Sequence, residues 1–341
     1  MKFFNDTIKY YFPVSLVTIM AFARFYFVCV TGGRDCTKSV EFPEIPLIKS
    51  IRMSAIDMVD NNFPSPHSEL LLGMLIGLDR LGELPDFSQK LKDTSTIHVV
   101  VVSGFNIALV FNLVVKVLGS QYRLRNVIIA QVITLFYSIL SGFEAPVVRA
   151  LVMGSIVSWG KYSGRLIDGL RVLIFAGAVM ILLEPAYLLS ISYQLSFMAS
   201  LGLILVSGSL SGVNLPEDLK STFSAQLLVW PIISIYFGRV SIIGLVVNPL
   251  ILWTVPISTI LGGIFLAGGL ISPVLAKFLS LLVYPFIDIF YRVIDFFGKL
   301  NNINVDYKIS LPHLCFYYFF IFACVHFVRK MIKSKHESKA G

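Results

Sequence analysis

Four polar or small residues, His98, Ser103, Gly104 and Asn106, interrupt an apolar run and form the first candidate site. Polar groups are costly inside hydrocarbon, so such a cluster is a functional hypothesis. A membrane helix that passes through Ser103 and Gly104 can open there and leave backbone groups to line a cavity. The same residues would also suit close helix packing, with Gly104 permitting the approach. The pattern alone leaves both interpretations open.

Catalysis is not expected from this cluster. Five residues along a helix turn the chain by about 140° around its axis, so His98 and Ser103 would face apart on a regular helix. No third residue is placed to orient them, and only a break in the helix would change this. The five histidines lack metal-ligand spacing, and no Cys-x-x-Cys pair occurs. We therefore expect no enzyme activity, no metal and no cofactor.

A second cluster surrounds Arg149. Pro146 suits the first turn of a helix, which places Arg149 about one turn inside the membrane. Its guanidinium either reaches the outer interface and pairs with Glu144, or projects into a wet passage as an anion contact. Small residues every four positions also predict a helix-packing seam, at Ala150, Gly154 and Ser158.

The remaining candidates are amides and a hydroxyl on later apolar runs: Gln194, Ser196, Gln226 and Asn248. Buried amides in membranes usually bond to neighbouring helices, and packing explains each residue taken singly. Pro231 and Pro249 stand close to two of them and free backbone carbonyls that a cavity can use. Together with the two clusters above, these residues are the predicted channel lining.

The composition requires a membrane setting for these residues. Of 341 residues, 56% are hydrophobic and 14% are charged, whereas soluble domains carry about 25% charged residues. This excludes a soluble enzyme and predicts an all-α, polytopic integral membrane protein with about ten transmembrane helices. Several spans are short or broken, as transport proteins show near a pathway. The candidate spans are 12–30, 97–118, 126–143, 146–160, 171–183, 185–207, 221–238, 240–252, 254–271 and 313–328.

We predict four segments along the chain. Residues 1–30 form a retained N-terminal membrane anchor, because they lack a clear small-residue cleavage site. Residues 31–96 hold half of the 20 acidic residues and form an outward-facing polar connector with amphipathic helices, including 69–78. Residues 97–328 are the membrane core, and 329–341 are a basic cytoplasmic tail.

Segment 274–298 is predicted to remain outside the count of spans. Four charged residues recur there at helical spacing, so the helix either lies in the outer interface or turns this stripe toward an aqueous cavity. Pro285 predicts a kink or break within it. The stripe consists of Asp288, Arg292, Asp295 and Lys299. Four cysteines lie near the two ends of the chain. We expect them to be isolated apolar residues. Cys29 with Cys36 and Cys315 with Cys324 could each cross-link as an alternative.

The basic residues indicate the orientation. Half of the 28 Lys and Arg residues fall on one side if both termini are cytoplasmic, and the short loops 119–125 and 161–171 are basic. Short loops follow the positive-inside rule best. The net charge of +8 is therefore mostly a topology signal rather than a DNA-binding face.

An ordered set of motifs resembles the membrane channel domain of the ComEC/Rec2 competence family. Each motif is weak alone, but the shared order over about residues 68–260 is specific. In chain order the motifs are 70–80 (LLLGMLIGLDR), 84–85 (LP), 98–106 (HVVVVSGFN), Tyr137 with Gly142, 148–150 (VRA) with Met153, 164–165 (GR) with Asp168, 184–185 (EP), 194–197 (QLSF), Gln226 with Pro231, and 248–249 (NP).

The chain departs from the family pattern in three ways. The family usually has His where Asn106 stands, and Gly with an aromatic residue where this chain has Ser192 and Tyr193. Longer members resemble an outer OB-like domain, the channel and a metallo-β-lactamase-like nuclease joined together. Here the outer segment is too short for an OB domain, and the sequence ends soon after the channel.

The resemblance implies a channel that passes single-stranded DNA inward across the cytoplasmic membrane. It also implies a separate DNA receptor, a nuclease and a cytoplasmic motor as partners, besides the lipid bilayer. Two alternatives remain open from the residues: a secondary transporter for a small anionic solute, and a non-transporting scaffold of the competence apparatus. The sequence gives no oligomeric state.

Overall fold

The computed structural model describes residues 2–32, 35–36, 45–119, 123–210, 215–241, 243–300, 304–306 and 309–340. Within these ranges the protein is helical except for one antiparallel ladder, in which β1 (Arg239–Ser241) pairs with β2 (Asn304–Asp306). The predicted all-α class, built of apolar helices, is therefore confirmed for the described part of the chain.

The helices follow one another with short connections. The first half contains α1 (Lys2–Phe25), α2 (Pro46–Asp60), α3 (His67–Ile76), α4 (Pro85–Asp93), α5 (Ile97–Val100), α6 (Gly104–Leu118), α7 (Leu124–Leu140) and α8 (Ala145–Tyr162). The second half contains α9 (Gly169–Leu183), α10 (Ile191–Leu205), α11 (Glu217–Phe237), α12 (Gly244–Leu252), α13 (Thr254–Gly269), α14 (Pro273–Gly298) and α15 (Leu311–Ala340). Short helices of other types are Tyr26–Thr31, Leu81–Glu83, Pro185–Leu189 and Ser207–Leu210.

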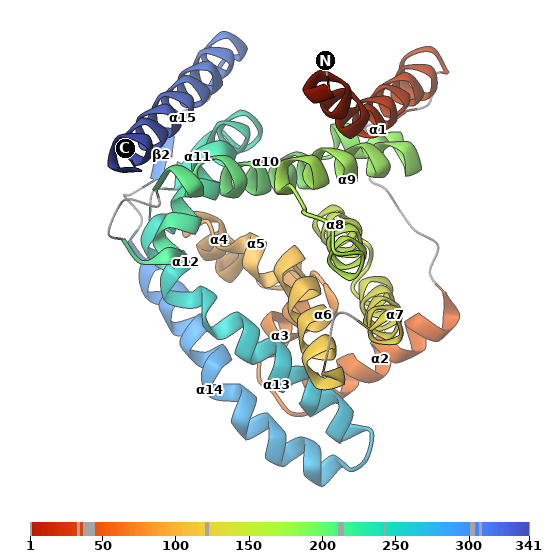
Figure 1. Ribbon diagram of the computed structural model, residues 1–341. Helices are drawn as coiled ribbons and strands as arrows, with labels where there is room; N and C mark the ends of the chain where they lie inside the picture. Colours follow the sequence, from red (N-terminus) through yellow and green to blue (C-terminus); the bar gives the residue numbers. More distant parts are fainter. Residues whose placement is uncertain are drawn as a thin grey trace.

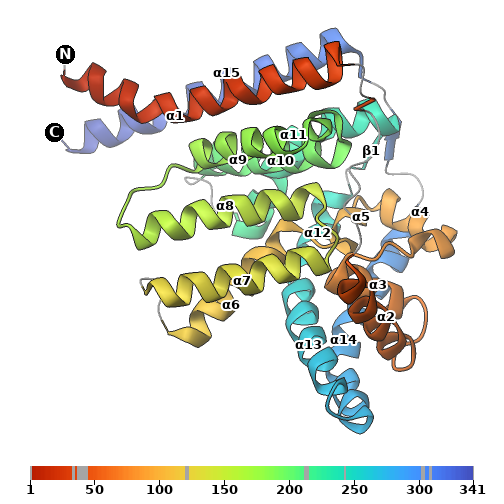
Figure 2. The same cartoon turned by 90° about the vertical axis from the view of Figure 1, so that its right-hand side faces the viewer.

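The helices form layers, with one pair crossing them. Figure 2 shows α1 and α15 along one side, then α9, α10 and α11, then α8, and then α6 and α7. The axes of α13 and α14, which pack as a hairpin, run across the axes of α7 and α8. Figure 1 shows α7 and α8 nearly end-on, whereas α13 and α14 lie in the plane of the view. Spanning helices tilt by about 20° on average. The pair α7 and α8 and the pair α13 and α14 therefore cannot both run close to the membrane normal.

The predicted number of about ten spans is not confirmed. In the described part of the chain, five segments are long and apolar enough to cross a membrane. Several other predicted spans are helices too short for this criterion, such as α9, and the two runs 240–252 and 254–271 join into one long segment. These five segments are Val14–Thr31, Ile97–Leu118, Ile191–Leu210, Gly244–Gly269 and Pro273–Gly298.

Helix α3 corrects the prediction of an amphipathic helix at 69–78. Every residue of α3 is buried, because α2, α5, α13 and α14 pack around it. The helix ends at Gly77 with φ +70°, and a Cβ there would lie 2.5 Å from the Ser141 carbonyl oxygen, so glycine is required. Leucines of α3 and Phe265 of α13 belong to the largest hydrophobic core. A helix from the predicted polar connector, α3, is thus part of the largest hydrophobic core.

The charged stripe of α14 faces neighbouring helices. His67 of α3 lies 3.2 Å from Asp288 Oδ1, and Lys90 Nζ of α4 lies 2.6 Å from Asp295 Oδ1. Each aspartate also pairs with the basic residue one turn on, Arg292 or Lys299. The stripe therefore docks α3 and α4 instead of facing an open cavity, and the helix continues through Pro285 without a break. By length and composition α14 could span, contrary to the expectation from its charges.

Charges near the end of α2 pair with each other. Arg80 donates to both carboxylate oxygens of Asp60, at 3.1 and 2.8 Å, and contacts Glu83 at 3.2 Å. Hydrogen bonds with Glu83 and with Asp60 raise the pKa of Arg80. Because these side chains are partly exposed, we expect the pairs to contribute at most about 1 kcal/mol each.

The cysteines differ from the expectation of isolated residues. Cys29, in the short π-helix after α1, forms a disulfide with Cys36. Cys315 and Cys324 are free and exposed on α15. The pairing was foreseen only as an alternative, because spacing on an apolar run does not show whether the chain turns back after the helix.

Candidate functional site

The helix that carries the first cluster is broken. Helix α5 ends at Val100, Val101 and Ser103 adopt extended backbone conformations, and α6 begins at Gly104. Figure 1 places α4 and α5 in the middle of the molecule, with α6 and α8 on one side and α11 and α12 on the other. We call residues 94–106, which include this break, the central segment. The opening at Ser103 and Gly104, one of the two predicted alternatives, is therefore present.

Arg149 of α8 lies against the break. A Cβ at Gly104 would lie 3.1 Å from Arg149 Nη2 and 3.1 Å from Ala150 Cβ. This is tighter than ordinary van der Waals contact, so only glycine lets α8 approach the start of α6 without displacing the guanidinium. On the other side, Arg149 Nε donates a 2.9 Å hydrogen bond to Ser196 Oγ of α10. Three predicted candidates, from α6, α8 and α10, are therefore brought together.

Glu144 does not pair with Arg149. Glu144 precedes α8 with an exposed side chain, and the charge that acts on it is the like-charged Asp79. Within the described residues Arg149 has no carboxylate partner, and its terminal nitrogens Nη1 and Nη2 have no hydrogen-bond acceptor. The half-buried guanidinium thus keeps donors available for an anion.

His98, Ser103 and Asn106 do not form one constellation. His98 has an exposed side chain on the short helix α5. Across the described contacts no hydrogen bond joins His98 to Ser103, although the break removes the helical geometry that would keep them apart. Asn106 is fully buried and donates from Nδ2 to the Met74 carbonyl at 3.1 Å. Asn106 therefore fastens α6 to α3. The described residues contain no group of three or more potential metal ligands.

Gln226 approaches the central segment from the opposite side. A Cβ at Gly244, the first residue of α12, would lie 3.1 Å from Gln226 Nε2, 3.2 Å from the Thr94 carbonyl oxygen and 2.8 Å from Ser95 Cβ. Helices α11 and α12 and the turn before α5 therefore meet at one point. Asn248 lies one helical turn after Gly244 and is also buried.

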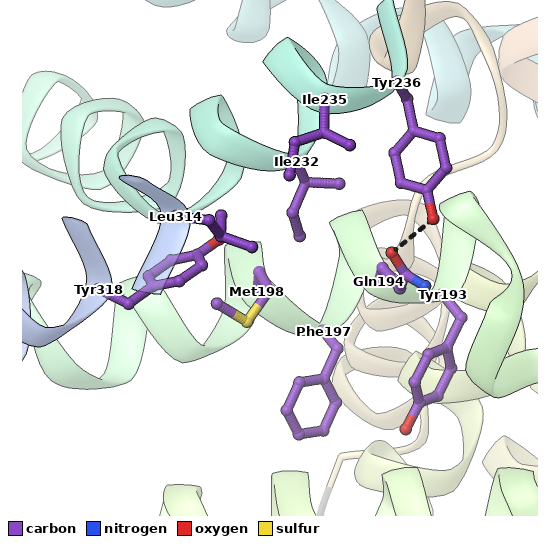
Figure 3. A pocket seen from close by; sticks show the side chains of 9 residues that line it. All are labelled: Tyr193, Gln194, Phe197, Met198, Ile232, Ile235, Tyr236, Leu314 and Tyr318. Atoms are coloured by element: carbon purple, nitrogen blue, oxygen red, sulfur yellow. Dashed lines mark hydrogen bonds between the residues drawn. The ribbon is translucent and has the colours of Figure 1, made fainter. Parts of the chain in front are cut away.

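Gln194 faces away from this centre. It lies two residues before Ser196 on α10, which is about 200° around the helix axis. Its Nε2 donates to the Leu188 carbonyl at 3.1 Å, and its Oε1 accepts from Tyr236 at 3.2 Å. Figure 3 shows it at the edge of an aromatic pocket of about 380 Å³ between α10, α11 and α15, which Tyr193, Phe197 and Tyr318 help to line. This pocket is separate from the Arg149 contact.

The sequence did not reveal which residue bonds to the backbone carbonyl that Pro231 leaves without a donor. Proline lacks an N–H, so the carbonyl four residues earlier, at Leu227, loses its helical donor. The Tyr317 hydroxyl of α15 donates to this carbonyl at 2.8 Å. The freed carbonyl is therefore bonded by protein and does not line a cavity. The presence of Pro231 signalled the need for a donor, but nothing local in the sequence pointed to Tyr317.

The predicted packing seam on α8 is not uniform. Ala150 contacts the break, but a Cβ at Gly154 would meet nothing within 4 Å. The Ser158 hydroxyl bonds within its own helix, to the Gly154 carbonyl. The close approach of α8 to the start of α6 is thus made at the turn that carries Arg149.

These features define a polytopic helical membrane protein whose polar residues gather around a broken helix. The chain belongs to the Competence protein family, whose match covers residues 75–331, and this family domain is the ComEC/Rec2 membrane domain. The resemblance found in the motifs is thereby confirmed. Membership indicates DNA handling within a membrane apparatus and a role in DNA uptake.

Relatives are distant and mostly longer. The chain is 28% identical over 265 residues to an uncharacterized protein of Aquifex aeolicus (strain VF5), with 76% of this chain and 62% of the relative covered. It is 29% identical to YcaI of Escherichia coli (strain K12), covering 61% of this chain and 30% of the relative. ComE operon protein 3 of Bacillus subtilis (strain 168) is 25% identical, with 65% and 29% covered. The chain spans less than two thirds of each, and no solved structure matches it.

Proposed function

We propose that the chain forms a transmembrane channel that passes single-stranded DNA across the cytoplasmic membrane during DNA uptake. The observation that carries this proposal is the position of Arg149. Its guanidinium is held by Ser196 against the broken central segment, without a carboxylate partner among the described residues. A cation in that position needs an anion, and the permeant supplies one at every phosphate.

The chemistry of arginine suits this role. The planar guanidinium binds phosphate oxygens through two parallel N–H donors, and Nη1 and Nη2 of Arg149 are available for this. A channel must bind its permeant strongly enough to admit it and weakly enough to release it. One arginine among neutral amides and hydroxyls meets this requirement better than a row of cations. Tyr137 packs beside the break and adds an aromatic surface close to it, as stacking of bases requires.

We propose that both termini are cytoplasmic. Figure 2 shows the two termini on the same side as the end of α6, the start of α7 and the α8–α9 connection, and basic residues are concentrated in these places. The Cys29–Cys36 disulfide lies at the other end of α1, in keeping with an oxidising compartment outside the membrane. A strand would then enter from the side of α2 to α4.

The proposed channel acts without catalysis of its own. A separate DNA receptor, a nuclease that supplies single strands and a cytoplasmic motor would be its partners. The alternative of a permease for small anions uses the same arginine, and the two predict different substrates.

The test measures uptake of labelled DNA by cells that lack the chain and by the same cells complemented with it. We expect uptake to disappear in the deletion and to return with the native chain. Purified protein in vesicles should show no saturable flux of small anions. Unchanged uptake in the deletion would contradict the channel, and saturable small-anion flux blocked by Arg149→Gln would support the permease. A scaffold would retain uptake when Arg149 is replaced.

A further inference from the structure

Helix α11 carries a stripe of buried polar atoms without partners. Thr222, Gln226 and Trp230 recur every four residues, so they share one face of the helix. Thr222 Oγ1, both amide atoms of Gln226 and Trp230 Nε1 are enclosed and have no hydrogen-bond partner among the described residues. Thr222 and Gln226 are only 7% and 8% exposed.

At Gln226 this stripe adjoins the central segment. Gln226 Nε2 approaches Gly244, which also contacts the backbone at Thr94 and the side chain of Ser95. Asn248 follows Gly244 by one turn on α12, so it lies on the same helical face. Asn248 is 3% exposed and its Oδ1 also lacks a partner in the described part of the chain. Two amides, Gln226 and Asn248, therefore lie on the side of the central segment opposite to Arg149, and Trp230 follows Gln226 by one turn on the same face of α11.

Other buried atoms, such as Asn106 Oδ1 and Ser258 Oγ, also lack a partner among the described residues, but on this stripe three residues of one helix face do so together. An amide buried without a hydrogen bond is strongly disfavoured, above all in a membrane, where no bulk water can replace the bond. Gln194 shows that both atoms of the same amide group find a partner elsewhere in this protein, namely Leu188 and Tyr236. Buried polar groups that remain unsatisfied in native proteins call for an unseen partner such as water or a ligand.

We propose that Gln226, Asn248 and Trp230 form a nucleobase site beside the central segment, hydrated when no strand is present. This inference rests on the proposed function and adds to it a division of labour. Arg149 contacts phosphate on one side of the segment, and the uncharged amides contact base edges on the other. An amide offers both donors and an acceptor, so by reorienting it can meet each of the four bases. An indole stacks on bases regardless of sequence.

The test uses single cysteines in the purified full-length chain. Cys315→Ser and Cys324→Ser remove the free thiols, and Gln226→Cys or Asn248→Cys introduces one at the site. A charged methanethiosulfonate reagent then reports access from water. Leu228→Cys, at a fully buried apolar position of α11, is the matched negative control. Leu166→Cys, at a position 95% exposed, is the positive control.

We expect both site cysteines to react and Leu228→Cys to remain inert. A mixed-sequence single-stranded oligonucleotide at about ten times its Kd should slow the reaction about tenfold, because only the free site reacts. An abasic oligonucleotide of equal length should protect much less. Inert site cysteines beside a reactive Leu228→Cys or Leu166→Cys would overturn the site. Equal protection by both oligonucleotides would overturn its assignment to bases.

A second variant keeps the proposal testable if cysteine disturbs folding. Gln226→Leu removes the amide that is proposed to bind base edges, so we expect oligonucleotide binding weakened several-fold without a fall in melting temperature. A lower melting temperature with unchanged binding would show that Gln226 is a structural residue. Strand binding that depends on Arg149 but leaves the site cysteines unprotected would contradict this inference alone. Absence of any strand binding by the native chain would contradict the proposed function itself.

Discussion

Arg149 Nε and Ser196 Oγ lie 2.9 Å apart and join α8 to α10 beside the break before α6. The serine fixes the direction of the guanidinium and leaves the terminal nitrogens available. We expect Ser196→Ala to lower DNA uptake by about fivefold, which corresponds to the loss of about 1 kcal/mol from one hydrogen bond. In an Arg149→Gln background the same change should have no further effect. Additive losses in the double variant would show that Ser196 acts independently of Arg149.

Gly104 provides a second test of this contact. A Cβ at Gly104 would lie 3.1 Å from the guanidinium, so Gly104→Ala should displace Arg149 and reduce uptake, and Gly104→Val should reduce it further. Gly154→Ala on α8 is the matched control, because nothing lies within 4 Å of its Cβ position. That control should retain uptake and stabilise α8 by up to about 1 kcal/mol. Equal uptake in all three variants would contradict the proposed contact.

The hydrogen bond from the Tyr317 hydroxyl to the Leu227 carbonyl should stabilise the protein because Pro231 removes the helical donor to that carbonyl. Tyr317→Phe leaves the Leu227 carbonyl without a donor, and we expect a loss of about 1 kcal/mol in the free energy of unfolding. Pro231→Ala restores the backbone N–H four residues after Leu227, so Tyr317→Phe should cost less in that background. The free energies of the four variants, measured by unfolding in detergent, form a double-mutant cycle. A coupling energy of zero would be evidence against this role.

The cysteines give a direct check on the end of α1 that is proposed to lie outside the membrane. Alkylation of the unfolded protein without reductant should modify two cysteines, Cys315 and Cys324, and alkylation after reduction should modify all four. Intact mass spectrometry counts the adducts. Four adducts without reductant, from protein isolated under non-reducing conditions, would contradict the Cys29–Cys36 bond and remove its support for the orientation.

The sequence predicted the composition of the site better than its arrangement. Polar residues on apolar runs can be recognised because their placement in hydrocarbon is costly, and Gly104, Arg149 and Ser196 do meet in the structure. The 3.6-residue period also separates Gln194 from Ser196, but periodicity shows only relative directions on one helix. Which helix stands opposite each face is a tertiary property, and therefore Gln194 was grouped with residues from which it points away.

Two other expectations failed for a similar reason. Helix α3 has apolar residues on all sides and was assigned to a polar connector because acidic and proline residues surround it in the sequence. Its burial depends on α13 and α14, which are nearly 200 residues away in the chain. Likewise, the stripe of Asp288 and Asp295 looked like a water-facing surface, because His67 and Lys90 could not be recognised as their distant partners.

The most direct measurement compares DNA uptake by cells that carry Arg149→Gln, Arg149→Lys or Arg292→Gln at equal membrane levels. Arg292 is the matched control, since it loses the same charge from an exposed ion pair away from the break. We predict at least about tenfold lower uptake for Arg149→Gln, partial uptake for Arg149→Lys, which keeps the charge without the planar fork, and native uptake for the control. Native uptake with Arg149→Gln would contradict the account.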